Sequence, residues 1–466
     1  MRKLYADRLI ADGVVTQEEA DRMASEAYER VAQAHAELKE SIGAPPDTGA
    51  HELDRTMSRE PRTTVPADTL MSLGEQLLHL PESFNLHRKL QPLLQRRREA
   101  LEAGGPIDWA HAESLAFGSL LALGVPVRLT GQDTERGTFS QRHAVLHDSK
   151  TGERFSPLQH LRDANAPFEL HNSPLSEQAC MGFEYGYSVQ APDALVLWEA
   201  QFGDFVNSAQ VIIDQFLVSG LAKWGQTSRL TLLLPHGYEG SGPEHSSGRV
   251  ERFLQAAAEG NIRVANCTTP AQYFHLLRRQ ALVSKPRPLI VMTPKSLLRL
   301  PEAASRLEEL SDGHFERVID DPRFADGGRE AVTKLVLCSG KIYYDIAGHE
   351  ERENAGHIAI ARVELLYPFP EEDLVELMAS YPNLERVAWV QEEPRNMGPR
   401  AFMRRRMAKI LPERMSYDYV GRQLRAATGE GYSAAHKREQ ARIVLVALDL
   451  EDDRLEPDSS AQRPVM

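Results

Sequence analysis

Residues 194–248 read ALVLWEAQFGDFVNSAQVIIDQFLVSGLAKWGQTSRLTLLLPHGYEGSGPEHSSG, and this stretch decides the fold. It contains two short apolar runs, ALVLW (194–198) and LTLLL (230–234), separated by a segment long enough for a helix. Apolar runs of this length that alternate with helical segments are typical of parallel strands buried on both faces. The stretch therefore predicts a parallel sheet with helices on both sides.

The same alternation extends in both directions along the chain. Before this stretch lies VPVRL (125–129), and after it lie IRVAN (262–266) and PLIVM (288–292). A second alternating set starts near residue 333, with the runs KLVLCSG (334–340), HIAIARVEL (357–365) and RVAWVQEE (386–393). The pattern predicts an α/β fold with two parallel-sheet domains, at residues 106–300 and 301–466.

The first 105 residues have a different character. Thr16 and Glu19 have the spacing of a capping box, and mostly good helix formers follow as far as Glu40. Residues 41–66 contain Pro45, Pro46, Pro61 and Pro66 among serine, threonine and glycine, which is typical of an extended linker. Helical patterns return near 68–79 and 85–103 and end at a pair of glycines. We expect residues 1–105 to form a helical arm and linker.

The composition argues against several classes of protein. With 54 basic and 67 acidic residues, the net charge of −13 disfavours binding to nucleic acid or to an anionic membrane. No apolar run approaches the ~20 residues of a membrane span, and the N-terminus lacks the apolar stretch of a secretory signal. Cys180, Cys267 and Cys338 lie far apart, which excludes a disulfide framework and a zinc ribbon. We expect a cytoplasmic protein without a metal site of its own.

Polar and aromatic side chains gather where the predicted strands end. Glu177 starts a helix, Gln201, Phe202 and Phe205 follow the run ALVLW, and His245 lies in the loop after LTLLL. Ligands of open α/β sheets bind beyond the carboxyl ends of the strands. The sequence contains no P-loop, nucleophile elbow or HExxH motif, and its glycines lack the spacing of a dinucleotide fingerprint. The pattern therefore predicts a ligand site of another kind at this edge.

Several long segments resemble the decarboxylating, thiamine-diphosphate-dependent component of 2-oxoglutarate dehydrogenase complexes. They are LSEQACMGFEYGY (175–187), LWEAQFGDFVNSAQVIIDQF (197–216), LLPHGYEGSGPEHSSGRVERFLQ (233–255), KPRPLIVMTPKSLLR (285–299) and VQEEPRNMG (390–398). The resemblance covers nearly the whole chain and implies that both domains are transketolase-like, the first one binding the pyrimidine ring of the cofactor. A more distant similarity links this region to transketolase and pyruvate dehydrogenase.

One feature of that family is missing from the sequence. The family holds the cofactor's diphosphate and its Mg²⁺ in another domain through a GDG…N signature, and GDG does not occur in this chain. The resemblance therefore implies the C-terminal part of such an enzyme. The cofactor would be thiamine diphosphate, with Mg²⁺ held by a separate N-terminal, diphosphate-binding half.

The resemblance also assigns the central carboxylate of the site. Glu177 would form a hydrogen bond to a pyrimidine nitrogen and favour the imino tautomer, whose exocyclic nitrogen removes the proton from the thiazolium carbon. Such a carboxyl group must be buried, and burial raises its pKa so that it can share a proton. From the residues alone, Glu177 is equally well a solvated acid at a helix N-terminus.

Five further residues are expected at the same site. Phe205 would stack on the pyrimidine, with Gln201 and Phe202 lining the pocket, although both rings also fit a role as core residues. His245 matches the family's active-site histidine, which would position the 2-oxo acid or exchange protons, whereas lone histidines are more often structural. Asp133 aligns with an acidic position near the thiazolium, or it belongs to an Asx-turn. Arg142 and His143, further along the same loop, are expected to face the entrance.

The implied reaction is the oxidative decarboxylation of 2-oxoglutarate in the tricarboxylic acid cycle. The acyl product would pass to a lipoyl group on dihydrolipoyl succinyltransferase, and the chain would act as a homodimer or as part of a heterotetramer. Two alternatives stay open at this point. One is a transketolase-like or 2-oxo acid decarboxylase half-enzyme, and the other is a truncated, non-catalytic dimerisation fragment.

Overall fold

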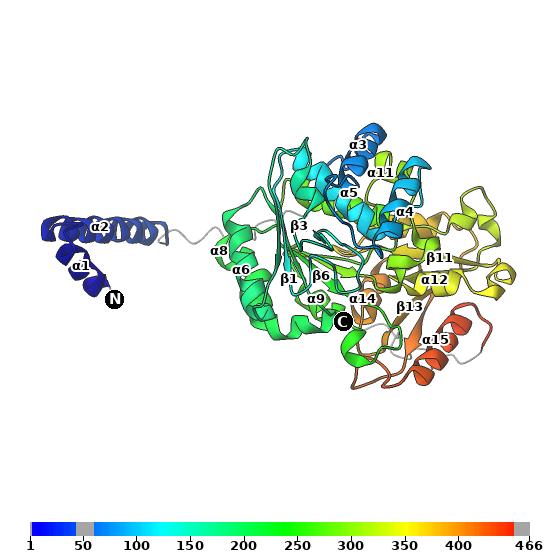
Figure 1. Cartoon of the computed structure of the whole chain (residues 1–466). Coiled ribbons are helices and arrows are strands. Elements are labelled where there is room, and N and C mark those ends of the chain that lie inside the picture. The colour runs from blue at the N-terminus through cyan, green and yellow to red at the C-terminus, as the bar shows by residue number, and fades with distance from the viewer. Residues whose placement is uncertain (1, 43–59, 452–466) are drawn as a thin grey trace. The chain divides into compact units, whose positions relative to one another are not determined.

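The computed structural model describes residues 2–42 and 60–451 (Figure 1). These residues belong to two separate compact units, an arm of residues 2–42 and an α/β body of residues 60–451. Most of the predicted linker, residues 43–59, lies outside the described residues.

The arm consists of helices α1 (Arg2–Ala11) and α2 (Gln17–Ile42). The predicted capping box at the start of α2 is confirmed. The main-chain N–H of Glu19 donates to Thr16 Oγ1 at 3.1 Å, and the N–H of Thr16 donates to Glu19 Oε2 at 2.8 Å. No side chain of residues 2–40 is buried.

A seven-stranded sheet with the order β12-β7-β8-β6-β5-β1-β4 forms the centre of the body. All neighbouring strands are parallel except β12, which runs antiparallel to β7. The strands are β1 (Val127–Gly131), β4 (Phe168–Asn172), β5 (Leu195–Glu199), β6 (Thr231–Pro235), β7 (Arg263–Ala265), β8 (Leu289–Thr293) and β12 (Leu365–Tyr367). Every residue of β5 and β6 is buried, as their continuous apolar runs predict.

A second, five-stranded sheet has the order β14-β13-β10-β11-β9. Strands β14, β13, β10 and β11 are mutually parallel, and β9 is antiparallel to β11. The strands are β9 (Val318–Ile319), β10 (Lys334–Cys338), β11 (Ile358–Val363), β13 (Arg386–Pro394) and β14 (Ser416–Arg422). A separate pair of short strands is formed by β2 (Leu146–His147) and β3 (Arg154–Phe155).

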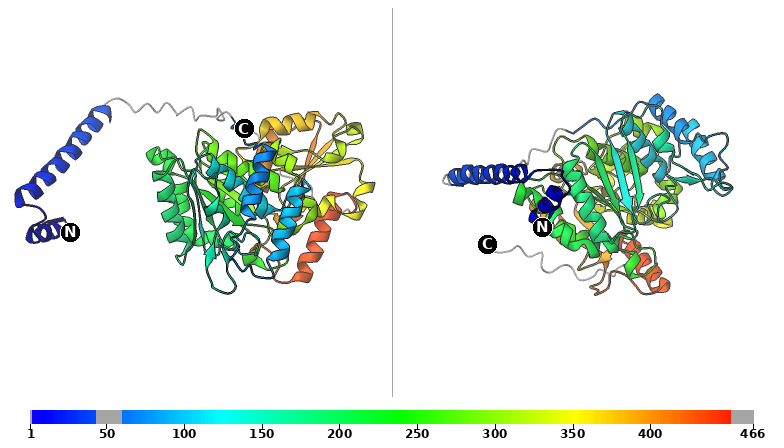
Figure 2. Two further views of the ribbon diagram at one scale, coloured as in Figure 1. Left: turned by 45° about the horizontal axis from the view of Figure 1, so that its top comes forward. Right: turned by 60° about the vertical axis from the view of Figure 1, so that its left-hand side comes forward.

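Helices cover both faces of the larger sheet (Figures 1 and 2). Leu195 and Leu197 of β5 pack with α3, α5 and α10 on one face, while Val196 and Trp198 pack with α6 and α9 on the other. The second of these cores continues into the five-stranded sheet. The helices of the body are α3 (Ala67–Leu77), α4 (Gln91–Glu102), α5 (Trp109–Ala122), α6 (Glu177–Gln190), α7 (Gln210–Ile212), α8 (Gly220–Trp224), α9 (Val250–Ala256), α10 (Pro270–Leu282), α11 (Leu307–Ser311), α12 (Ile342–Ala347), α13 (Glu371–Ala379), α14 (Arg400–Ile410) and α15 (Ser433–Ala447). The predicted α/β fold with two parallel sheets is confirmed.

The body begins earlier than the boundary that the sequence suggested. Helices α3 and α4, which the sequence analysis grouped with the arm, pack in the body, where Leu70, Leu73 and Leu101 join the core of the larger sheet. The preceding segment is held there too, because Arg278 Nε of α10 donates to the carbonyl of Thr63 at 2.7 Å.

The segment Gly203–Trp224 is helical but irregular. It runs through 3₁₀ turns at Gly203–Ala209, the short helix α7, a π-helical turn at Ile213–Leu217 and α8. Among the residues that the structure describes, it is the one helix long and apolar enough to cross a membrane, with a mean hydropathy of 1.2, and 28% of it is buried. Composition alone is weak evidence for a span, and this segment packs against α6.

Candidate functional site

Glu177 lies at the first position of α6, where the structure gives it two neutral hydrogen-bond donors. Ser176 caps the helix by accepting from the N–H of Ala179 at 3.4 Å. Glu177 Oε1 accepts from Gln132 Nε2 at 2.9 Å, and Glu177 Oε2 accepts from Ser208 Oγ at 2.7 Å. The side chain is half-buried, whereas the sequence analysis expected it to be fully buried. One face of the carboxylate is therefore open to a ligand.

Phe202, Phe205 and His245 form a row of rings near this carboxylate. The Ser208 hydroxyl that reaches Glu177 also lies 3.0 Å from the carbonyl oxygen of Phe205. The rings of Phe205 and Phe202 meet edge to face with centroids 5.5 Å apart, and those of Phe202 and His245 lie 4.1 Å apart. The structure thus brings the three predicted rings into contact and links Glu177 to the main chain of Phe205 through Ser208.

The two phenylalanines of this row are not core residues. Both rings are half-buried, and neither belongs to the hydrophobic cores of the body, whereas the neighbouring Val206 does. Phe139 contacts Phe202 from the other side, with ring centroids 6.0 Å apart. Aromatic surface that is held in place but not covered is suited to stacking on a flat ring.

His245 lies in the loop between β6 and α9. The loop forms a single 3₁₀ turn at Pro243–His245, and α9 begins at Val250. The imidazole is half-buried, and its Nδ1 atom is enclosed without a hydrogen-bond partner. A buried, unsatisfied nitrogen has a free-energy cost, which a ligand or water can relieve.

Asp133 and Gln201 lie near this row but outside it. The carboxylate of Asp133 forms an ion pair with Arg136, and its carbonyl accepts from the N–H of Gly137 at 2.8 Å. Gln201 is half-buried between the end of β5 and the 3₁₀ turn that starts at Gly203. Their assignment to the cofactor stays a prediction.

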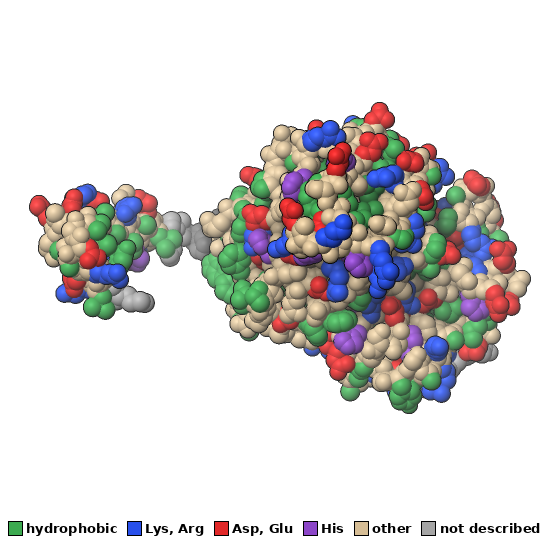
Figure 3. Space-filling model, in the orientation of Figure 1, with side chains coloured by type: hydrophobic (Ala, Val, Ile, Leu, Met, Phe, Trp, Pro, Cys, Tyr) green, Lys and Arg blue, Asp and Glu red, His purple; other side chains and the backbone are tan. Residues whose placement is uncertain are grey.

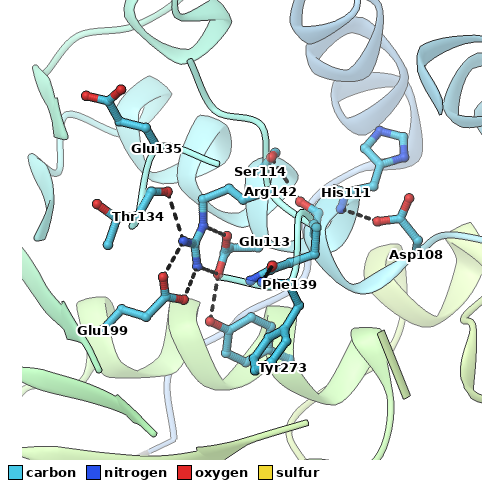
Figure 4. A network of polar contacts seen from close by, with 12 residues as sticks. Asp108, His111, Glu113, Ser114, Thr134, Glu135, Phe139, Arg142, Glu199 and Tyr273 are labelled. Carbon is cyan, nitrogen blue, oxygen red and sulfur yellow. Dashed lines mark hydrogen bonds and ion pairs between the residues drawn. The ribbon is translucent and has the colours of Figure 1, made fainter. Parts of the chain in front are cut away.

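A buried ionic cluster supports the loop that carries Asp133 (Figure 4). Arg142 contacts Glu113 at 2.5 Å and Glu199 at 2.6 Å, and its Nη1 donates to the carbonyl of Thr134 at 3.0 Å. Tyr273 donates to Glu113 Oε2 at 2.8 Å. Only 3% of the Arg142 side chain is exposed, so the expectation that Arg142 faces the entrance is wrong. Arg142 therefore holds this loop from inside the body. The two buried carboxylates balance its charge, which would otherwise be costly to bury.

Burial sets the protonation of this cluster. Loss of solvent raises the pKa of the Glu199 carboxyl, and the adjacent Arg142 guanidinium opposes that shift. The pKa of Arg142 lies well above its usual value, because the attraction of Glu113 and Glu199 outweighs the effect of burial. His143, the other residue expected at the entrance, is half-buried with a left-handed φ of 49°, and burial lowers its pKa.

Sequence reasoning missed several residues that shape the site. Glu113 and Tyr273 lie within helices, and no local pattern marks them. Lys295, however, lies two residues after β8 and Glu393 lies near the end of β13, and a buried charged residue at the end of a strand is a signal. His236 lies at the end of β6 and helps to shape the loop of His245.

Within residues 2–42 and 60–451, no group of three His, Cys, Asp or Glu side chains is placed to hold a metal ion. The side chains that line the site are a carboxylate, amides, hydroxyls, aromatic rings and an imidazole. This set suits a flat, uncharged heteroaromatic ring with hydrogen-bonding nitrogens.

Two family models match the body. The transketolase pyrimidine-binding domain matches residues 105–301, and the 2-oxoglutarate dehydrogenase C-terminal domain matches residues 304–448. Together they cover both sheets.

Curated relatives match over 96% of this chain. The chain is 50% identical over 459 residues to the 2-oxoglutarate dehydrogenase E1 component of Geobacillus sp. (strain WCH70). It is 51% identical over 460 residues to that of Geobacillus kaustophilus, and 48% identical over 462 residues to that of Bacillus subtilis (strain 168). The matches cover 48% of each relative, so the chain spans about half the length of the curated relatives it matches.

A solved structure has a similar fold. A split gene transketolase, described as an inactive beta4 tetramer, aligns with a TM-score of 0.50 and 17% identity, over 74% of this chain and 98% of that one. With its two matched domains and its identity of about half to these relatives, the chain belongs to the 2-oxoglutarate dehydrogenase E1 family, of which it represents the C-terminal half.

Proposed function

We propose that the chain forms the pyrimidine-binding half of a thiamine diphosphate site in a 2-oxoglutarate dehydrogenase. The observation that carries this proposal is the row of Phe205, Phe202 and His245, with Glu177 linked to the main chain of Phe205 through Ser208. These residues lie beyond the carboxyl ends of β4, β5 and β6. The proposed reaction is the oxidative decarboxylation of 2-oxoglutarate in the tricarboxylic acid cycle, which takes place in the cytoplasm. The relatives' shared name supports this choice of substrate.

The side chains present fit one end of this cofactor. A carboxylate with an open face can share a proton with a ring nitrogen, and a fixed aromatic surface can stack on the pyrimidine. The other end needs a metal ion and diphosphate ligands, and among the described residues no group of three His, Cys, Asp or Glu side chains is placed to hold a metal ion. We therefore assign the diphosphate and Mg²⁺ to a partner, an N-terminal half like the part of the relatives that this chain does not match.

Each residue of the row has a separate task. When bound, thiamine diphosphate supplies the carbanion-equivalent carbon that cleavage of a 2-oxo acid requires. Glu177 holds a proton at its carboxyl group against the pyrimidine ring, and Gln132 and Ser208 keep that carboxyl oriented. Phe205 and Phe202 exclude water from the ring, and His245 exchanges protons with the bound 2-oxo acid. The acyl product then passes to the lipoyl group of dihydrolipoyl succinyltransferase.

A second copy of the chain is the proposed partner for an apolar face on α6 and the segment 203–224. Phe183 is 57% exposed, Val211 56% and Trp224 50%, and Leu175 and Phe216 are exposed beside them. Figure 3 shows hydrophobic side chains gathered over this part of the body. Exposed apolar patches of this kind mark protein interfaces, and this one lies next to Glu177.

The proposal is tested by reconstitution. The chain is purified alone and together with the first half of the Bacillus subtilis relative, and both samples are titrated calorimetrically with thiamine diphosphate and Mg²⁺. We expect tight binding only in the mixture, together with succinyl transfer from 2-oxoglutarate to a lipoyl acceptor. Tight binding by the chain alone would refute the half-site. A mixture that binds the cofactor but releases a free aldehyde would refute the assigned reaction.

A further inference from the structure

The loop that carries His245 is closed at its base by His236. The N–H of Gly248 donates to His236 Nδ1 at 2.9 Å, which joins the two ends of residues 236–248. Since a main-chain amide donates to Nδ1, the ring hydrogen lies on Nε2. Nε2 lies 3.1 Å from Glu393 Oε1 and donates to it.

Glu393 belongs to the other sheet. Glu393 lies near the end of β13. Both partners are buried, with 6% of the His236 side chain and 7% of the Glu393 side chain exposed. This contact therefore crosses from the C-terminal domain into the pyrimidine-binding domain, and water is excluded from it. A charge-assisted hydrogen bond in such a place is stronger than one on the surface.

Other residues of the C-terminal domain reach the same loop. Thr428 Oγ1 donates to the carbonyl of Pro243 at 2.6 Å, two residues before His245. The guanidinium of Arg422 lies over the buried ring of Tyr238, 4.9 Å from its centroid. A side chain at Gly240 would come within 3.1 Å of the His436 ring in α15. The C-terminal domain thus contacts the loop along most of its length.

The pyrimidine-binding domain also holds the loop. The ammonium group of Lys295, a buried side chain that follows β8, donates to the carbonyl of Gly237 at 2.7 Å and also to that of His245. The loop has internal bonds as well, from the N–H of Gly237 to the carbonyl of Ser246 and from Ser246 Oγ to the carbonyl of Gly242. The imidazole of His245 itself keeps an unpartnered Nδ1.

We propose that the C-terminal domain positions His245, through the chain of hydrogen bonds Glu393–His236–Gly248 and through the bond from Thr428 to Pro243. Glu393 and Thr428 are then positioning residues that act through the loop without touching the substrate. This inference rests on the proposed function for the role of His245, whereas the mechanical coupling itself does not depend on it. The coupling also gives the C-terminal domain a role in the site in addition to its packing.

The coupling is tested on the whole chain by hydrogen exchange of peptides that cover residues 236–248, and by ¹⁵N NMR of the His236 ring. The variants are Glu393→Leu, which removes the acceptor, Glu393→Gln, which keeps an acceptor oxygen, and Thr428→Val. Tyr381→Phe is the matched control, because it removes the 2.6 Å bond to Asp320 within the C-terminal domain.

For Glu393→Leu we expect exchange in the loop to rise about tenfold, the size of effect of one lost buried hydrogen bond. The ¹⁵N spectrum should then no longer show His236 as a single tautomer protonated at Nε2. Glu393→Gln should restore both readouts, Thr428→Val should raise loop exchange alone, and the control should change neither.

Three outcomes would overturn the proposal. They are unchanged loop exchange in Glu393→Leu and Thr428→Val, an equal rise in the control, or failure of Glu393→Gln to restore the His236 spectrum. If Glu393→Leu does not fold, Thr428→Val and Glu393→Gln decide the question. Loss of activity in the reconstituted enzyme without any change in exchange would count against the proposed coupling and leave the proposed function intact.

Discussion

The burial of Glu177 differs from what the sequence predicts. A fully buried carboxylate was expected, and the structure has a half-buried one that two neutral side chains orient. A second copy of the chain on the neighbouring apolar face would remove more of its water. In the proposed dimer, the second copy would supply part of the surroundings of Glu177.

Replacing Glu177 by Gln tests its role directly. The amide keeps the size and an acceptor oxygen but has no proton to share, so we expect kcat of the reconstituted enzyme to fall by about 10²–10⁴-fold, the usual contribution of an acid or base. Steady-state kinetics measure this effect. Turnover near that of the wild type, in a variant whose free energy of unfolding is unchanged, would contradict the assignment.

His275 makes the stability of the body depend on pH. It is buried, Nδ1 lies 2.8 Å from Thr63 Oγ1 and Nε2 lies 2.7 Å from the carbonyl of Glu309, and burial lowers its pKa from 6.5 to about 4. Between these values the unfolded chain binds a proton that the folded chain does not, so stability rises with pH there.

We therefore expect acidification from pH 6.5 to about 4 to cost up to about 3 kcal/mol of unfolding free energy through His275. His275→Gln should flatten this part of the pH profile in urea unfolding experiments. His79, which is exposed, supplies the control. If His79→Gln reduced the pH dependence of the unfolding free energy by the same amount, the prediction would be contradicted.

At the level of elements, Arg142 joins four parts of the body. Its ion pairs connect the loop after β1 with α5 and β5, and Tyr273 extends the cluster to α10. These elements are far apart in sequence, so no local pattern marks their meeting point. The expectation for Arg142 failed for that reason.

Arg142→Met is expected to destabilise the body by about 3–5 kcal/mol, because Glu113 and Glu199 would stay buried without a cation. Chemical denaturation measures the change. Arg136→Met removes an ion pair at a side chain that is 51% exposed, and we expect it to shift stability by at most about 1 kcal/mol. An equal loss of unfolding free energy in the two variants would contradict a larger stabilising role for the buried cluster.

The strands that sequence reasoning missed share a physical reason. β4, β9 and β14 lie at sheet edges, where one side of the strand has no neighbour and a continuous apolar run is not required. The central strands β5, β6, β8 and β10 were recognised because both of their faces are buried. For the site, Glu177, Phe202, Phe205 and His245 were predicted through motif resemblance, whereas His236 and Glu393 meet only once two domains are packed together.

At the scale of the whole molecule, the apolar face around Phe183 and Phe216 predicts the oligomeric state. Phe183→Glu combined with Phe216→Glu should shift the chain towards the monomer in light scattering, because charge opposes burial of this face. Val375→Glu, at a 43% exposed position in α13, is the control. A mass unaffected by the double substitution would place the interface elsewhere.

The position of strand β12 affects how the chain folds during synthesis. The strand belongs in sequence to the C-terminal domain, yet it closes the edge of the larger sheet by pairing with β7. During synthesis, this edge stays uncovered until Tyr367 has left the ribosome, about 100 residues after β7 itself. A fragment cut between the two matched domains would expose the same edge to other chains. The protein is therefore best expressed with both domains on one polypeptide.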